Sequence, residues 1–169
     1  MPQYSQGAYR YGDYVAKYAV FPIGDKQKEL ASTMLKETDP MDILSANLRR
    51  FHAEEKATFS FCVQLLENLE EQPVEDLGIE WKDDKYPWQQ VGTLEFEPQD
   101  SFDNAFRTWW DDSGVACNPW HGLTTLQPLG GANRVRRVVY AESRKKRLNM
   151  NGNKKYQEPT KVQEVPVAA

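Results

Sequence analysis

The sequence predicts an α+β fold in which a few long strands are flanked by helices. Two runs rich in β-branched and aromatic residues, 12–21 and 88–97, favour strands, and Pro22 ends the first of them. The run 57–66 alternates between large apolar side chains and small or polar ones, which is typical of a strand with two different faces. A strand with one small or polar face suits the wall of a barrel that lines a cavity.

Helices are predicted on both sides of these strands. Asp39 and Pro40 resemble an N-cap followed by proline at the first helical position, and the apolar spacing after them predicts an amphipathic helix over 40–55. A shorter helix is predicted around 101–110. The last ordered element begins after a pair of glycines and is predicted to be a helix over 131–148.

The other segments are interpreted as loops and a tail. The polar stretch 24–38 has only a weak helical pattern, and the acidic loop 67–86 contains a short β-like run at 77–81. Beyond the last helix the chain is polar, contains proline and is aperiodic, which predicts a flexible tail over 149–169. The chain is therefore divided into one ordered domain over 1–148 and this tail.

Length and composition fit one globular domain. The chain has 169 residues, 40% of them hydrophobic and 12% aromatic, which excludes a chain disordered throughout. No stretch approaches the roughly 18 consecutive apolar residues of a membrane span, and the N-terminus lacks the apolar core of a secretion signal. Cys62 and Cys117 form neither a disulfide framework nor a zinc motif, so we expect a reducing, cytoplasmic compartment.

Charge is divided unevenly along the chain. Residues 1–133 carry a formal charge of −11 and residues 134–169 carry +7, within a total of −4. The run 144–147, Arg-Lys-Lys-Arg, makes a non-enzymatic binding or interaction module with a basic C-terminal helix the alternative function, although bases also suit the end of a solvated helix. Nucleic acid is not the expected partner, because the basic run has no interleaved aromatic residues and the rest of the chain is acidic.

The helix predicted over 131–148 carries a tyrosine and two arginines on one face. Arg136 and Tyr140 are four residues apart, and Arg147 follows seven residues later. A phenol has a pKa near 10, so a tyrosinate at neutral pH needs a positive partner, a metal ion or both. Arginine keeps its proton and can donate to a phenolate, and haem iron accepts tyrosinate as an axial ligand. Taken alone, this spacing is weak evidence, because it is more typical of an ordinary amphipathic helix with a half-buried tyrosine.

Several blocks of the chain resemble, in order, the catalase-like haem proteins, and in particular their short catalase-related branch. The resemblance covers about residues 9 to 148, the C-terminal half of that family's domain. The closing blocks are Asn118-Pro119-Trp120-His121-Gly122-Leu123, Pro128-Leu129-Gly130-Gly131 and Asn133-Arg134-x-Arg136-x-x-x-Tyr140-x-x-Ser143. The earlier blocks are Tyr11-Gly12-Asp13-Tyr14-Val15-Ala16-Lys17-Tyr18, Val63-Gln64 within 61–65, Pro73-Val74-Glu75-Asp76 with Trp81, and Val91-Gly92-Thr93-Leu94 leading to Gln99-Asp100.

The resemblance implies a haem b site whose proximal side comes from this chain. In that family a tyrosinate of the closing helix binds the iron, and an arginine one turn earlier donates a hydrogen bond to it. These roles fall on Tyr140 and Arg136, and Arg147 falls where an arginine can reach a haem propionate. The family activity is the breakdown of hydrogen peroxide, organic peroxides or fatty-acid hydroperoxides, and the sequence does not separate these substrates.

The distal side of such a site has no counterpart in this sequence. Family members carry a distal histidine and an asparagine before the block at 11–18, where this chain opens. His52 and His121 lie outside any distal motif and are interpreted as structural, so no catalytic residue is assigned.

The resemblance also implies a fold: a partial antiparallel β-barrel, the second half of a catalase-type barrel, with flanking helices and a C-terminal haem-ligand helix. A half-barrel leaves strand edges with unpaired backbone groups. We therefore expect a truncated or split form that needs the missing N-terminal half, a second copy of itself or another element to cover these edges.

Overall fold

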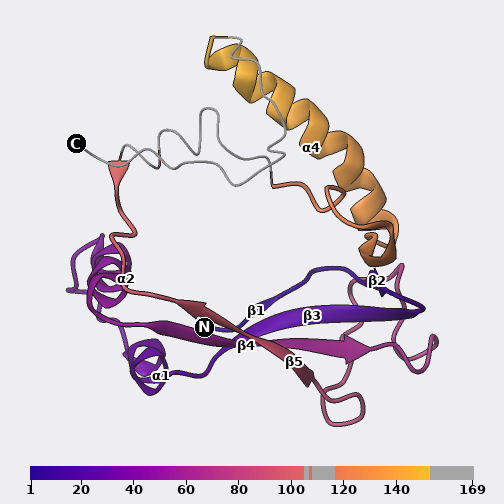
Figure 1. Ribbon diagram of the computed structural model, residues 1–169, viewed down its shortest axis with the longest axis horizontal. Helices are drawn as coiled ribbons and strands as arrows, with labels where there is room; N and C mark the ends of the chain where they lie inside the picture. Colours follow the sequence, from indigo (N-terminus) through magenta and orange to yellow (C-terminus); the bar gives the residue numbers. More distant parts are fainter. Residues whose placement is uncertain (105–106, 108–116, 153–169) are drawn as a thin grey trace.

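The strands form one antiparallel sheet, with α1 and α2 at one end and α4 rising from the other (Figure 1). The computed structural model describes residues 1–104, 107 and 117–152. The strands are β1 (Gln3–Tyr4), β2 (Tyr9–Tyr11), β3 (Tyr14–Pro22), β4 (Ala57–Leu65) and β5 (Gln89–Phe96). The helices are α1 (Asp25–Ser32), α2 (Ile43–Glu54) and α4 (Gly131–Met150), with a 3-10 turn η2 (Thr124–Leu126).

The sheet is open rather than closed into a barrel. Its order is β1-β3-β4-β5, and β2 pairs with the same edge of β3 as β1 does. Among the described residues, β5 pairs with β4 alone, so no strand joins the two edges of the sheet. The predicted mixture of helices and antiparallel strands is confirmed, whereas the partial barrel is not.

A tight hairpin that the sequence interpretation missed joins β2 to β3. Tyr11 pairs with Tyr14, so the connection consists of Gly12 and Asp13 alone. Gly12 has a φ of 63°, in the left-handed region that favours glycine and that two-residue hairpin loops require. The strand predicted over 12–21 therefore begins two residues later, and a short strand precedes it.

The two faces of the sheet differ as the alternation in β4 predicts. The register pairs Val63 with Tyr18 and Phe61 with Val20, and these four residues together with Phe59 form the aromatic face. Ser60, Cys62 and Gln64 point to the opposite, polar face and are all buried. The alternation had led us to expect that this polar face lines a cavity; instead, the loop between β4 and β5 packs against it at Gln64.

Hydrogen bonds from Gln64 hold that loop against the sheet. Its side chain is 1% exposed, and its amide nitrogen donates to the main-chain oxygens of Trp81 (3.2 Å) and Tyr86 (2.8 Å). Trp81 is itself buried, and the Lys17 ammonium lies 4.5 Å from the centre of its ring. Residues 77–81 are therefore a loop whose apolar side chain covers the sheet, and not the short strand that their composition favours.

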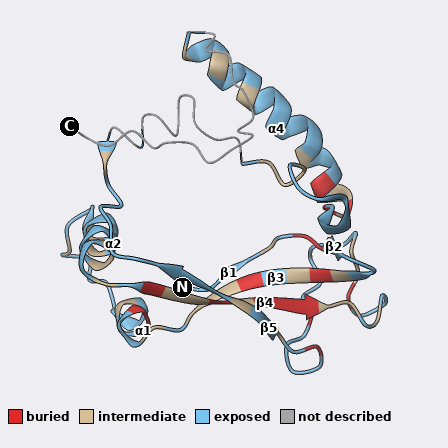
Figure 2. Cartoon of the chain, in the orientation of Figure 1, coloured by how far each residue is buried: buried red, intermediate tan, exposed pale blue. Residues whose placement is uncertain are grey.

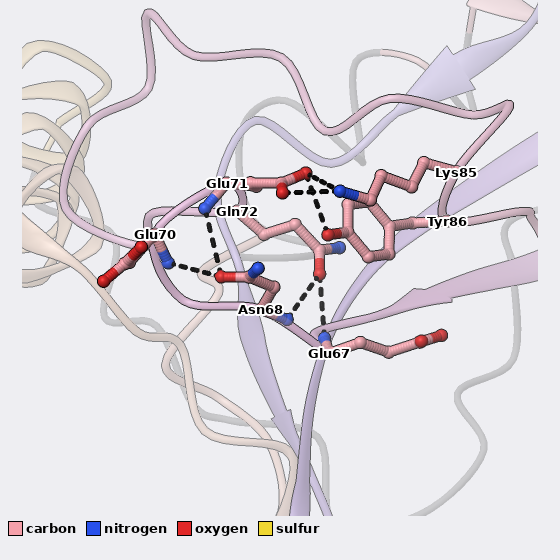
Figure 3. Close-up of polar contacts among 7 residues, drawn as sticks. All are labelled: Glu67, Asn68, Glu70, Glu71, Gln72, Lys85 and Tyr86. Atoms are coloured by element: carbon pink, nitrogen blue, oxygen red, sulfur yellow. Dashed lines mark hydrogen bonds and ion pairs between the residues drawn. The ribbon is translucent and has the colours of Figure 1, made fainter.

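A second buried amide shapes the start of the same loop (Figure 3). The oxygen of Gln72 accepts hydrogen bonds from the main-chain nitrogens of Glu67 (2.8 Å) and Asn68 (3.1 Å). Its nitrogen donates to the main-chain oxygen of Leu65 (2.9 Å), at the end of β4. Because the side chain is fully buried and its amide oxygen and nitrogen both form hydrogen bonds, it holds one loop conformation.

Acidic side chains of this loop pair with neighbours within it. The Glu71 carboxylate accepts from the Lys85 ammonium and from the Tyr86 hydroxyl (3.0 Å), as Figure 3 shows. The Lys85 ammonium, and then the Tyr86 hydroxyl, hold the pKa of Glu71 below its usual range. The negative charge of Glu71 therefore links the start of the loop to its end at Lys85 and Tyr86.

The amphipathic helix predicted over 40–55 is present but begins later. Its N-cap is Asp42, because the Asp39 carboxylate instead accepts from the main-chain nitrogen of Lys36 (2.8 Å). Leu44 and Leu48 on its apolar side are 61% and 53% exposed, and α2 is largely pale blue in Figure 2.

The remaining helix predictions have mixed outcomes. The weakly helical stretch 24–38 contains α1, and the helix predicted over 131–148 ends two residues later than expected, at Met150. The helix predicted around 101–110 falls largely outside the described residues, as does the tail from 153 onward. No helix in the described ranges is both long and apolar enough to cross a membrane.

We predict that Gln64→Met destabilises the fold. The substitution preserves the size of the side chain but leaves two buried main-chain oxygens without donors, which costs about 2 kcal/mol or more of unfolding free energy. Urea unfolding measures the loss. Gln90→Met, at an exposed amide on β5, is the matched control and is expected to have little effect; equal unfolding free energies for the two variants would contradict the assignment.

Candidate functional site

The base of α4 lies against the N-terminal segment of the chain. The main-chain nitrogen of Arg10 donates to the oxygen of Gln127 (2.8 Å), and that of Leu129 donates to the oxygen of Ala8 (2.9 Å). Between these bonds, Tyr9 forms an isolated antiparallel bridge with residue 128. Residues 127–129 thus run beside β2 and lead directly into α4, which joins segments more than 100 residues apart in sequence.

A glycine makes the sharp entry into α4 possible. Gly130 has a φ of 83°, and a Cβ atom built on it would lie 2.6 Å from the main-chain oxygen of Val74. Both the left-handed backbone and the close approach exclude a side chain at this position without distortion. The glycine pair that the sequence marked as a helix boundary therefore also packs against the loop after β4.

Glu75, from the same loop, caps the helix. Its carboxylate accepts from the main-chain nitrogen of Gly131 (2.8 Å) and from both terminal nitrogens of Arg134 (2.9 Å each). A carboxylate at this place satisfies one free donor of the first turn and faces the positive end of the helix dipole. The Arg134 guanidinium, and more weakly the Gly131 N–H, hold the pKa of Glu75 below its usual range, against the opposing effect of burial.

Asn133 joins the helix to the N-terminal segment. It is 1% exposed, and its amide nitrogen donates to the main-chain oxygens of Leu129 (2.7 Å) and Ala8 (3.3 Å). Its own main-chain oxygen accepts from the indole nitrogen of Trp120 (2.7 Å). Gly7 packs so closely that a Cβ there would lie 2.7 Å from the Asn133 amide nitrogen. From the sequence we had named Asn133 only as the first residue of a closing block and had assigned it no role.

Arg136 is held at the same junction. One terminal nitrogen donates to the Asn133 amide oxygen (3.2 Å), and the other donates to the amide oxygen of Gln6. Nothing in the sequence pattern pointed to Gln6, because the contact joins two segments 130 residues apart.

Arg136 also lies beside the phenol of Tyr9. Burial, and then a hydrogen bond with Tyr18, raise the pKa of Tyr9 to about 12, although the nearby Arg136 guanidinium acts in the opposite direction. The rings of Tyr9 and Tyr18 are 5.0 Å apart, and Tyr18 belongs to the aromatic face. The base of α4 and the aromatic face therefore meet at Tyr9.

Tyr140 and Arg147 lie farther along α4, in the order that the sequence predicts. Tyr140 follows Arg136 by one turn and is 38% exposed. Arg147 is exposed in the last turn, about 10 Å farther along the axis at 1.5 Å per residue. Within the described parts of the chain, neither side chain has a hydrogen bond or an ion pair, so the phenol oxygen has no protein partner there.

Neither histidine belongs to α4. His52 belongs to α2, at the end of the sheet opposite the base of α4 (Figure 1), and its ring packs edge-on against Phe51 at 5.3 Å. His121 is exposed in the turn that Asn118 begins. No group of three or more His, Cys, Asp or Glu side chains in the described ranges is arranged to hold a metal ion.

Comparison with known proteins identifies a similar fold. No protein-family model and no curated protein matches the chain. A fungal catalase of known structure matches with a TM-score of 0.61 and 17% identity, over 89% of this chain and 31% of the catalase. Catalase A from Saccharomyces cerevisiae matches with a TM-score of 0.61 and 16% identity, over 88% of this chain and 32% of the catalase. The chain thus has a catalase-like fold and spans about a third of the length of these catalases.

We predict that Gly130→Ala weakens the docking of α4. The φ of 83° and the contact with Val74 together should cost about 2 kcal/mol of unfolding free energy. Urea unfolding followed by circular dichroism measures the loss. Gly122→Ala is the control, because no atom lies within 4 Å of a Cβ at that position; an equally small effect of both substitutions would contradict the predicted strain.

The Glu75 cap predicts a dependence of stability on pH. Because the pKa of Glu75 is lowered in the folded chain, its contribution is fully present above the ordinary pKa of 4.5 and is lost as the pH falls through the lowered value. The Glu75→Gln variant should therefore lose less stability than the unaltered chain over this acidic range. Thermal unfolding at a series of pH values between neutral and acidic measures this loss of stability. Glu54→Gln, at an exposed position on α2, is the control. Identical pH profiles for Glu75→Gln and the unaltered chain would refute the role of Glu75.

Proposed function

We propose that this chain is a catalase-like haem-binding protein that supplies the proximal, tyrosinate side of a haem b site. The proposal rests on one observation: the phenol of Tyr140 is exposed and has no hydrogen-bond partner among the described residues. Arg136 lies one turn before it on the same helix. The catalase-like fold of the chain agrees with this assignment.

The donor set of α4 fits ferric haem. The phenol oxygen of Tyr140 would bind the iron as a phenolate, and the charge of Arg136 would favour that ionised form. Arg147, with an exposed guanidinium two turns beyond Tyr140, would bind a propionate. Each of these residues offers the type of atom that its role needs.

Apolar surface near the same helix fits the body of the cofactor. Tyr18, on the aromatic face of the sheet, is 38% exposed. The aromatic face of the sheet meets the base of α4 at Tyr9, so an apolar surface and a basic helix adjoin. Haem has a flat apolar body with two carboxylates at one edge, and it would bury this exposed apolar area on binding.

The proposed activity is that of the family, the breakdown of peroxides or hydroperoxides. Bound ferric haem supplies the redox chemistry that cleaves the O–O bond. The part of this chain would be to bind and orient that group, with Tyr140 as an anionic ligand that favours ferric iron. We assign the chain the proximal side alone, because neither His52 nor His121 lies in a segment that resembles the family's distal motif.

Titration with hemin tests the proposal. The unaltered chain should bind hemin and give the absorption spectrum of tyrosinate-ligated ferric haem, and Tyr140→Phe should abolish that spectrum because it removes the ligand oxygen. Tyr14→Phe, at a tyrosine 65% exposed on β3, is the matched control and should bind as the unaltered chain does. An unchanged Soret band on addition of the unaltered chain to hemin would overturn the proposal.

A further inference from the structure

Two arginines near the start of α4 have partners of different charge. Arg134 forms a bidentate ion pair with the Glu75 carboxylate, at 2.9 Å from each terminal nitrogen. The terminal nitrogens of Arg136 donate instead to two neutral amide oxygens, those of Asn133 and Gln6. No ion pair with a carboxylate involves Arg136 within the described ranges. Arg136 is therefore held in place while its charge is left uncompensated.

Gln6 is well placed to act as a fixed acceptor. On one side of it, the main-chain nitrogen of Ser5 donates to the oxygen of Tyr18 (2.8 Å), which ties the segment to β3. On the other side, the main-chain oxygen of Ala8 accepts from Leu129 (2.9 Å), which ties it to the entry of α4. Because its backbone is fixed on both sides, the Gln6 amide meets the guanidinium with little loss of entropy.

We propose that Gln6 is a positioning residue for haem binding, which holds the Arg136 guanidinium with its positive charge free to act on the Tyr140 phenolate. This inference rests on the proposed role of Tyr140. A guanidinium has five N–H donors, and the bonds to Gln6 and Asn133 use two of them. A neutral acceptor fixes the orientation of the group without forming an ion pair, whereas a carboxylate at the same place would fix it and also cancel its charge.

The Gln6→Glu substitution separates these two effects. It keeps the shape and the acceptor atom of the side chain but adds a negative charge next to Arg136. We expect hemin to bind roughly tenfold more weakly to Gln6→Glu, and likewise to Gln6→Leu, which loses the acceptor. Gln3→Glu adds the same charge at an exposed position of β1 and should bind hemin as the unaltered chain does.

The Gln6→Glu result discriminates between a structural role and a role in positioning charge. A merely structural role predicts that Gln6→Glu binds hemin with unchanged affinity and spectrum, because the hydrogen bond to Arg136 is retained; this result would overturn the inference. Failure of the unaltered chain to bind hemin would instead overturn the proposed function.

A measurement without hemin tests the contact itself. In ¹⁵N NMR spectra of the hemin-free chain, we expect the Arg136 guanidinium to rotate slowly in the unaltered protein and freely in Gln6→Leu. Equally free rotation in both would refute the positioning by Gln6, whatever the outcome of the hemin titration.

Discussion

The placement of α4 depends on one buried amide, that of Asn133. Its nitrogen bonds two main-chain oxygens from different segments, and its oxygen accepts from Arg136. A buried amide whose donors and acceptor are all used stabilises one arrangement, because any other leaves polar atoms unsatisfied. Arg136, Tyr140 and Arg147 take their positions relative to the sheet from this junction, since all lie on the helix that Asn133 anchors.

Buried amides give the sheet its asymmetry as well. Gln64 and Gln72 hold the loop after β4 over the polar face, and that loop in turn supplies Glu75 to the start of α4. The aromatic face is left facing the side on which α4 meets Tyr9. One loop therefore covers the polar face and caps α4, and this leaves the aromatic face beside a basic helix.

The sequence predicted the regular elements well and the junctions poorly. The alternation in β4 and the glycine pair before α4 depend on local periodicity and backbone freedom, so they are visible in a single segment. The hairpin at Gly12 was missed although its turn residues carried a signal. Asp39 was expected to cap α2, but its side chain accepts a hydrogen bond from the main-chain nitrogen of Lys36 instead. An N-cap bond and this turn bond are local alternatives of similar strength, so the sequence does not decide between them.

By itself, the sequence determined that Tyr140, Arg136 and Arg147 share one face of a helix, because helical periodicity alone decides which residues align. It also determined the two-faced character of β4. Only the tertiary structure decided that the sheet stays open, and that Gln6 and Asn133 hold Arg136 while Glu75 neutralises Arg134. Those contacts join residues that are far apart along the chain, and no local pattern specifies which of many polar side chains will meet.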